Sequence, residues 1–269
     1  TVHGTYSVQN RLKKFYNAIM LKADAIIVVS NFIKEYLIKN YQFKNKEFPL
    51  EKITVIQRGV DLNYFDCTRV STNWKIQTST KWGIPEDKKI ILMPARFTAW
   101  KGHEFFIDAL SKVKNDFYCV MVGSDHGHKK FRKKLENKII KQNLASKIKI
   151  VGLCKDMTVA YAISHFVVCP SVKPEAFGRI AIEAQASNKI ILATNIGGSL
   201  ETIIDKKTGF LVEVGDTENF AKLIDFVLEM PKNEMDEIVK AGRKHMEENF
   251  SNKKMCENTI AVYKNLLGL

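Results

Sequence analysis

The sequence predicts an α/β fold built on parallel sheets. Two observations carry this prediction: short, continuously apolar runs recur along the chain, and amphipathic stretches of helical length separate them. Strands that are apolar on both faces and alternate with helices are typical of doubly wound parallel sheets. With 269 residues, 45% of them hydrophobic, the chain is long enough for one large domain or two modest ones.

The expected strands and helices follow one another along most of the chain. Ala25 to Val29 is the first apolar run, and Ser30 is placed to cap a helix that ends near Lys39. Further strands are expected at 53–56, 90–93, 117–122, 148–151, 166–169 and 190–193. Helices are expected at 103–113, 129–143, 156–164, 178–187, 216–229, 232–248 and 252–267.

Residues 58–88 break this rhythm, because they are rich in polar side chains and end at Gly83-Ile-Pro85. We therefore expect a linker at 59–87 between an N-terminal unit, 1–58, and a larger unit, 88–248. The helix in 249–269 is expected to pack back on the N-terminal unit. Residues 1–58 hold two or three strands, too few for a complete doubly wound domain, so we expect the front of that domain to be missing.

Composition limits the function classes. The 42 basic and 29 acidic residues give a net charge of +13, which favours anionic partners. A nucleic-acid partner rests on charge alone, without the interleaved aromatic platform of single-strand binders. The five cysteines contain no Cys-x-x-Cys pair, which disfavours zinc ribbons and redox motifs and fits a reducing cytosol. There is no apolar run of the roughly 18 residues that a membrane span needs, and no secretory signal.

Two carboxylates eight positions apart mark the candidate site. Glu175 lies on a loop bounded by prolines, and Glu183 lies within an apolar run of helical character. Between them Gly178 allows the backbone to approach a ligand, and the helix N-terminus that follows favours a phosphate. A phosphate with hydroxyls on either side describes a nucleotide-sugar. The alternative is that Glu183 caps or pairs within an ordinary helix.

A pair of cations supports this interpretation. Arg96 and Lys101 directly follow the apolar run 90–93, and ligands of open α/β sheets bind at the carboxyl ends of strands. Two cations there would neutralise a diphosphate and stabilise it as a leaving group. The alternative is two solvated cations on a loop.

Together these residues resemble the retaining nucleotide-sugar glycosyltransferases of the GT-B fold, specifically glycosyltransferase family 4 (group 1 type). The resemblance covers essentially the whole chain. Its landmarks occur in family order: Asp24 to Ser30, Gly59-Val60-Asp61, Arg96 with Lys101-Gly102, Val122-Gly123, Val151-Gly152, Pro170-Ser171, Glu175 to Glu183, Gly197-Gly198 with Glu201, Thr208-Gly209 and Gly215-Asp216. It implies a GT-B fold of two Rossmann-like domains, here with an incomplete N-terminal one.

The resemblance also implies residue roles. Arg96 and Lys101 would hold the donor diphosphate, Glu175 the hydroxyls of the transferred sugar, and Glu183 the ribose hydroxyls. His3, near the end of an N-terminal strand, would face the sugar across the cleft. The remaining donor-binding candidates are the backbone near Leu153 and Cys154, which would face the base, and Phe177, Gly178, Arg179 and Ile180, which would approach the phosphate or sugar.

Family members retain the anomeric configuration by same-face attack, with the leaving phosphate helping to take the acceptor proton. No Asp-x-Asp occurs in the chain, so no metal or other cofactor is expected, and the donor would be UDP- or GDP-linked. Two positions depart from the family pattern: Ala95 replaces a frequent glycine, and Ser187-Asn188-Lys189 replaces the usual Gly-x-Pro.

The expected function is transfer of a sugar to a glycan or lipid-linked acceptor, in cell-envelope polysaccharide or lipopolysaccharide synthesis. The expected location is cytoplasmic, and peripheral attachment to the inner, anionic membrane face is a further expectation. The first alternative is an inactive or split-gene remnant that binds nucleotide or a partner chain. A sugar-nucleotide 2-epimerase shares the fold but fits the two residue pairs poorly. A Rossmann dehydrogenase is disfavoured because no Gly-x-Gly-x-x-Gly follows a strand.

Overall fold

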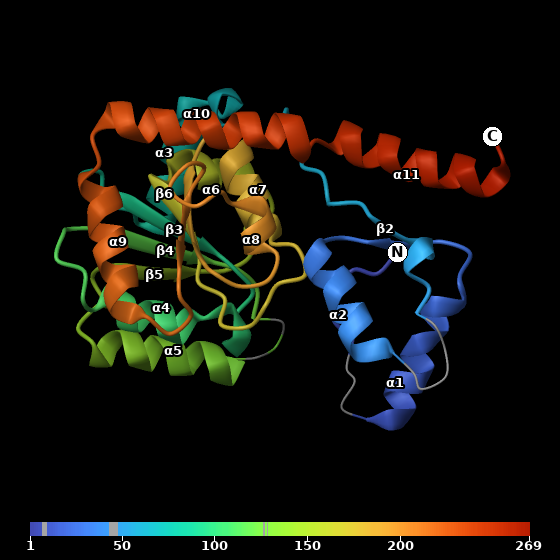
Figure 1. The fold of residues 1–269 in the computed structure, drawn as a ribbon. Helices are drawn as coiled ribbons and strands as arrows, with labels where there is room; N and C mark the ends of the chain where they lie inside the picture. Colours follow the sequence, from blue (N-terminus) through green and yellow to red (C-terminus); the bar gives the residue numbers. More distant parts are fainter. Residues whose placement is uncertain (7–9, 43–47, 126, 128) are drawn as a thin grey trace.

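The computed structural model describes residues 1–6, 10–42, 48–125, 127 and 129–269. It is an α/β structure with two parallel sheets, as the apolar runs predict (Figure 1). The smaller sheet pairs β1 (Ile26–Val28) with β2 (Ile53–Val55), and Val2 forms a further parallel bridge to Val28. The larger sheet has the order β5-β4-β3-β6-β7-β8. Its strands are β3 (Ile90–Pro94), β4 (Tyr118–Val122), β5 (Ile148–Val151), β6 (Phe166–Cys169), β7 (Ile190–Thr194) and β8 (Phe210–Val212).

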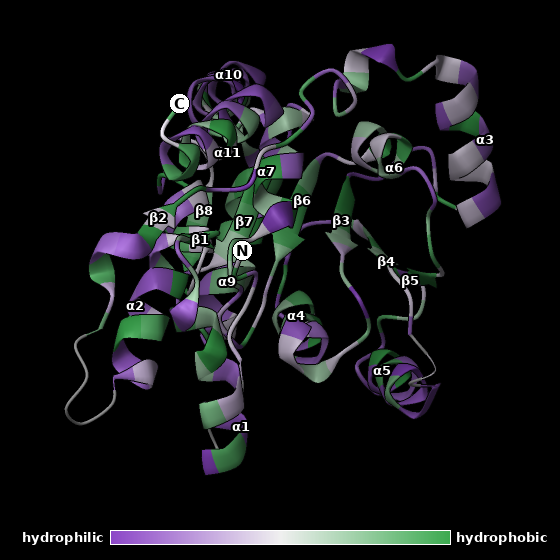
Figure 2. Cartoon of the chain, turned by 90° about the vertical axis from the view of Figure 1, so that its right-hand side faces the viewer, coloured by the Kyte–Doolittle hydropathy of each residue, from purple (hydrophilic) through white to green (hydrophobic). Residues whose placement is uncertain are grey.

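Helices cover both faces of the larger sheet. Alternate residues of each central strand enter opposite cores: Leu92 packs with one cluster, and Ile91 and Met93 pack with the other. The strands carry hydrophobic colouring in Figure 2, as expected of a sheet that is buried on both faces. One face is covered by α3 (Thr72–Trp82), α6 (Met157–Ile163) and α7 (Arg179–Ala186), and the other by α4 (His103–Leu110), α5 (Lys129–Lys141) and α9 (Thr217–Glu229). The long helix α10 (Lys232–Asn249) contacts both cores, the first through Met246 and the second through Met235 and Ile238.

The smaller unit is formed by the β1–β2 sheet with α1 (Arg11–Asn17) and α2 (Asn31–Tyr41). Ser30 caps α2 as the sequence predicts, because its Oγ accepts a hydrogen bond from the Ile33 amide at 3.1 Å. The C-terminal helix α11 (Asn252–Leu267) runs from the end of α10 over this unit (Figure 1). Just before α11, the Phe250 carbonyl accepts a hydrogen bond from the Val60 amide, which follows the smaller unit in the chain, at 2.7 Å. None of the residues of α11 is buried, so its packing on the smaller unit stays a prediction.

The expected strands are all present, within a residue or so of their predicted ends. The helices expected after residue 100 are present as well, although α4 ends at Leu110 and α5 at Lys141, three and two residues before their predicted ends. The expectation of a plain linker at 59–87 missed helix α3, whose residues are mostly polar. Its ends carry signals that the composition obscured: Ser71 caps the Trp74 amide, and Gly83 closes the helix in the left-handed conformation. Trp82 anchors α3 in the core. The short elements α1, α8 (Ser199–Thr202) and β8 were not predicted either.

The structure describes no helix that is long and apolar enough to cross a membrane.

His103, at the start of α4, is expected to make stability depend on pH. Its side chain is fully buried, and burial lowers its pKa to about 4. Between pH 6.5 and about pH 4 the unfolded chain therefore binds a proton that the folded chain does not, and stability falls as pH falls. The expected loss is about 3 kcal/mol over that window, from 1.4 kcal/mol per pH unit.

Urea unfolding of the wild type and His103→Leu at several pH values measures this contribution. The free-energy difference between the two proteins should change across the window and level off above pH 7. A pH-independent difference would contradict the assignment.

Candidate active site

The larger sheet reverses its strand order between β3 and β6, and the candidate residues follow these two strands. From β3 the chain goes outward to β4 and β5, and from β6 it goes the other way to β7 and β8. Ligands of open α/β sheets bind in the crevice outside the carboxyl ends of the strands at such a switch point. The segment with Arg96 and Lys101 follows β3, and the segment with Glu175 follows β6. The topology thus brings together two segments about 75 residues apart in the chain.

A cleft of about 800 Å³ lies at this place, between the two units. Its lining combines residues from the N-terminal unit with both segments of the larger one: His3, Gly4, Thr5, Arg58, Arg96, Trp100, Lys101, Lys173, Pro174, Glu175, Ala176, Phe177, Gly178, Arg179 and Ile180. The lining includes eight of the predicted site residues; Leu153, Cys154 and Glu183 are not part of it.

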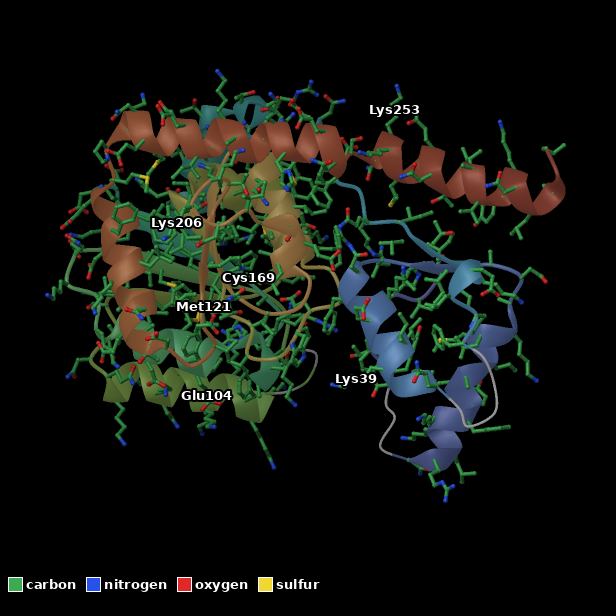
Figure 3. The ribbon with its side chains drawn as sticks, in the orientation of Figure 1. Lys39, Glu104, Met121, Cys169, Lys206 and Lys253 are labelled. Atoms are coloured by element: carbon green, nitrogen blue, oxygen red, sulfur yellow. The ribbon has the colours of Figure 1, made fainter. Side chains whose placement is uncertain are left out.

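Glu175 and Lys101 form an ion pair at the base of the cleft. The Lys101 Nζ lies 2.7 Å from the Glu175 Oε1, and the two side chains are 8% and 11% exposed. The same oxygen accepts hydrogen bonds from the Ser171 hydroxyl at 2.6 Å and the Cys169 thiol at 3.2 Å. Figure 3 places Cys169, the last residue of β6, within the sheet layer. Burial alone would raise the pKa of Glu175, but the Lys101 charge and these hydrogen bonds outweigh it and hold the pKa below its ordinary value. Glu175 is thus an anion at neutral pH.

The N-terminus of α7 opens into the cleft. Gly178 is its cap residue, with a φ of 85° that favours glycine, and Gly178, Arg179 and Ile180 all line the cleft. An added Cβ on Gly178 would meet its nearest atoms at 3.7 Å, so the positive φ, rather than close packing within the chain, requires glycine there. The first amides of a helix have no partner within the helix, and together with the helix dipole they favour an anion.

Glu183 lies one turn further along α7 and is 14% exposed. One carboxylate oxygen accepts from the Tyr161 hydroxyl at 3.0 Å, and the other pairs with Arg179 at 2.9 Å. Burial raises the pKa of Glu183, although Arg179 and Tyr161 act in the opposite direction. Glu183 thus makes the intrahelical pair that was the alternative interpretation, and its contact with a ribose stays a prediction.

His3 and Arg58 form the opposite wall of the cleft. The Arg58 Nη2 lies 2.8 Å from the His3 Nδ1, and because an arginine can donate but not accept, the His3 Nδ1 accepts and its proton lies on Nε2. Partial burial and the Arg58 charge lower the pKa of His3, so the imidazole is neutral at pH 7. Arg96 is exposed on the other side of the cleft, with its guanidinium open to a ligand.

The sequence reasoning missed several residues of the site. Arg58, Trp100 and Lys173 line the cleft, and Ser171 and Cys169 hold Glu175. Arg58 immediately precedes the Gly59-Val60-Asp61 landmark, which was a signal that it lies close to the site. The contacts of Ser171 and Cys169 depend on how the chain turns after β6, which no local pattern reveals.

The fold and the site together define a class: an α/β protein of the GT-B type, with a cation- and carboxylate-lined cleft at the switch point of its larger sheet. Residues 75–245 match the family of group 1 glycosyl transferases, and residues 1–64 match glycosyltransferase family 4. The chain belongs to the group 1 glycosyl transferase family.

Solved structures and curated proteins with similar sequences agree with this membership. A glycosyltransferase structure from Rickettsia africae ESF-5 is 40% identical with a TM-score of 0.89, and the match covers 98% of this chain and 69% of that one. The lipopolysaccharide core biosynthesis mannosyltransferase LpcC of Rhizobium leguminosarum is 26% identical, over 98% of this chain and 71% of its own. Anabaena Alr3699/HepE, solved with UDP and glucose, shares the fold at 21% identity and a TM-score of 0.87, over 100% of this chain and 70% of its own.

The chain is shorter than these proteins. It is 28% identical to glycosyltransferase MJ1607 of Methanocaldococcus jannaschii, a match that covers 89% of this chain and 59% of that relative.

Proposed function

We propose that the protein transfers a sugar from a nucleotide-diphosphate donor to an acceptor hydroxyl, with retention of the anomeric configuration. The observation that carries the proposal is the buried Lys101–Glu175 pair beside the N-terminus of α7, in one cleft with Arg96. Anion-binding groups and a fixed carboxylate, a few side chains apart, suit a ligand that carries phosphate and hydroxyls together. Anabaena HepE, which has the same fold, was solved with UDP-glucose, and this supports a nucleotide-sugar ligand.

Each group has a part in donor binding. The amides at the start of α7 and the Arg96 guanidinium take the diphosphate, and Lys101 adds a second positive charge next to it. The Glu175 carboxylate has one oxygen occupied by Lys101, Ser171 and Cys169, which leaves the other to accept from sugar hydroxyls. Glu183 takes the ribose hydroxyls, and the backbone near Leu153 and Cys154 faces the base.

The reaction follows from this arrangement. The acceptor oxygen forms a bond to the anomeric carbon while the bond from that carbon to the diphosphate oxygen breaks. The electron pair of the broken bond goes to the diphosphate, which takes the acceptor proton. Attack on the same face preserves the configuration. Positioning and leaving-group stabilisation supply most of the rate enhancement, and in our proposal Arg96 and Lys101 provide the positive charge without a metal ion.

The acceptor in our proposal is a glycan or lipid-linked glycan of the cell envelope, and the enzyme works in the cytoplasm at the anionic membrane face. The similarity to LpcC, named for lipopolysaccharide core synthesis, supports this acceptor class. The net charge of +13 supports attraction to an anionic surface. The neutral His3, with its Nε2 proton available, acts on the sugar from the side of the N-terminal unit.

The second candidate is a remnant that binds nucleotide or a partner chain without turnover. A calorimetric panel of UDP- and GDP-sugars, followed by an assay for release of nucleoside diphosphate, tests both candidates. Binding with release supports the enzyme, binding without release supports the remnant, and no binding of any nucleotide-sugar refutes the donor site.

Replacing Arg96 by alanine is expected to weaken nucleotide-sugar binding by about 10- to 100-fold, because a hydrogen-bonded charge is lost from the diphosphate. Its unfolding free energy should stay within about 0.5 kcal/mol of the wild type, since the side chain is exposed. Calorimetry and urea unfolding measure the two quantities. Arg69→Ala, an exposed arginine outside the cleft, is the matched control and should bind normally. Equal affinity in Arg96→Ala would remove Arg96 from the donor site.

A further inference from the structure

A carboxylate of the larger unit binds the N-terminus of a helix of the smaller one. Glu201, on α8, accepts the Phe32 amide at 2.7 Å through Oε1. Its Oε2 accepts the Asn31 amide at 2.9 Å and the Asn31 side-chain amide at 3.1 Å. The Gln57 side chain donates to the same oxygen at 3.1 Å. All four donors belong to the N-terminal unit, and Figure 1 shows the start of α2 next to loops of the larger unit.

This contact suits a carboxylate for physical reasons. Asn31 and Phe32 are the first two residues of the eleven-residue helix α2, so their amides have no partner within the helix. The helix dipole adds a positive potential at the same place. Hydrogen bonds to an ionised acceptor are stronger than those between neutral groups. Neutral replacements at position 201 would therefore weaken the whole set of bonds at once.

A second contact joins the same helix end to the backbone beside Glu175. The Ser30 hydroxyl, which caps α2, also donates to the Ala176 carbonyl, and Ser30 is fully buried. Within the larger unit, the Gly198 amide donates to the Glu175 carbonyl at 2.9 Å. These hydrogen bonds link three segments to one another. The start of α2 bonds to Ala176 through Ser30, the adjacent Glu175 carbonyl bonds to Gly198, and α8, which follows Gly198, bonds to the start of α2 through Glu201.

We infer that Glu201 and Ser30 are positioning residues, which hold the two units closed over the cleft and fix the Glu175 segment in the geometry that transfer requires. The inference rests on the proposed function. The contacts of Glu201 and Ser30 keep His3 and Arg58 in the same cleft as Glu175. We call the contacts of Glu201 and Ser30 between the two units the latch. The groups that bind the phosphates in our proposal, Arg96, Lys101 and the first amides of α7, all belong to the larger unit. The latch therefore acts on turnover and not on nucleotide affinity.

The first measurement is the distance between the units. Spin labels are placed on the exposed positions of Lys39→Cys on α2 and Lys133→Cys on α5, after the exposed native Cys256 is changed to serine. Glu201→Ala is expected to lengthen or broaden the distribution by several ångströms, as hinge motions do. Glutamine is nearly isosteric with glutamate, so the distance distribution of Glu201→Gln should lie between those of Glu201→Ala and the wild type. Glu213→Ala, an exposed glutamate that accepts from Asn195 within the larger unit, is the matched control and should leave the distances unchanged.

The second measurement separates positioning from binding. Glu201→Ala should lower kcat at least about tenfold while the affinity for UDP or GDP stays within about threefold of the wild type. An unchanged distance distribution in Glu201→Ala overturns the latch, and so does a loss of nucleotide affinity as large as the loss of kcat. If Glu201→Ala does not fold, Glu201→Gln carries both measurements. If the wild type binds no nucleotide, the proposed function fails while the distance measurement still decides the latch.

Discussion

Glu175→Gln is expected to lower the rate of sugar transfer by about 10²- to 10³-fold, the loss typical of removing one preorganised charged group from an active site. The amide keeps the shape of the side chain but has no charge to offer the sugar hydroxyls or Lys101. Initial rates of nucleoside diphosphate release give kcat and kcat/KM. A fall in both by the same factor is expected if Glu175 acts in the transition state.

The same substitution should reduce stability, because it leaves the buried Lys101 ammonium without its counter-charge. Removing one partner of a buried ion pair costs about 3–5 kcal/mol, and the wild type should therefore unfold at clearly higher urea concentration. Lys101→Met in the Glu175→Gln background removes the stranded charge and is expected to recover part of the stability without recovering activity. Wild-type turnover in Glu175→Gln would contradict the role assigned to this carboxylate.

Gly198→Ala is expected to disrupt the site by displacing the backbone of Phe177, which lines the cleft. An added Cβ would lie 2.4 Å from the backbone of Phe177, a distance that forces the two segments apart. Since the φ of Gly198 is −64°, the effect comes from the clash and not from the backbone conformation. Overpacking of this kind costs about 1–3 kcal/mol, and we expect donor affinity to fall with it because Phe177 and Gly178 line the cleft.

Gly152→Ala is the matched control for stability, because an added Cβ there meets nothing within 4 Å. Thermal unfolding of both variants separates the clash from the general effect of replacing glycine, and nucleotide calorimetry compares Gly198→Ala with the wild type. If Gly198→Ala were as stable as Gly152→Ala and bound donor as tightly as the wild type, the contact between these segments would not support the site.

The fold was predictable because its main signals are local. Apolar runs such as Ile90–Pro94 and Ile190–Thr194 are buried on both faces, which gives them a clear pattern in the sequence. Helix α3 was missed because most of its residues are polar. It is stabilised by its two caps and by one buried tryptophan, Trp82. The Ser71 and Gly83 caps were local signals that could have been used, whereas the packing of α3 against α6 is not visible in any local pattern.

The candidate site was predictable to the extent that its residues follow strand ends. Arg96, Lys101 and Glu175 meet in one cleft because β3 and β6 are neighbours at the switch point. The sequence did not predict how these side chains pair with one another. Lys101 forms an ion pair with Glu175, and Glu183 contacts Arg179 and Tyr161. Such pairing depends on distances of a few ångströms between segments far apart in the chain. Glu201 was recognised as a landmark in the sequence, but only the structure shows that it contacts the start of α2.

The central claim is that the cleft between Arg96, Glu175 and the start of α7 is the donor site. A crystal structure of the protein soaked with UDP tests this claim most directly. We predict that the terminal phosphate lies within hydrogen-bonding distance of the Arg96 guanidinium and of the Arg179 or Ile180 amide, with the ribose next to Glu183. Well-ordered UDP bound elsewhere, with this cleft left empty, would contradict it.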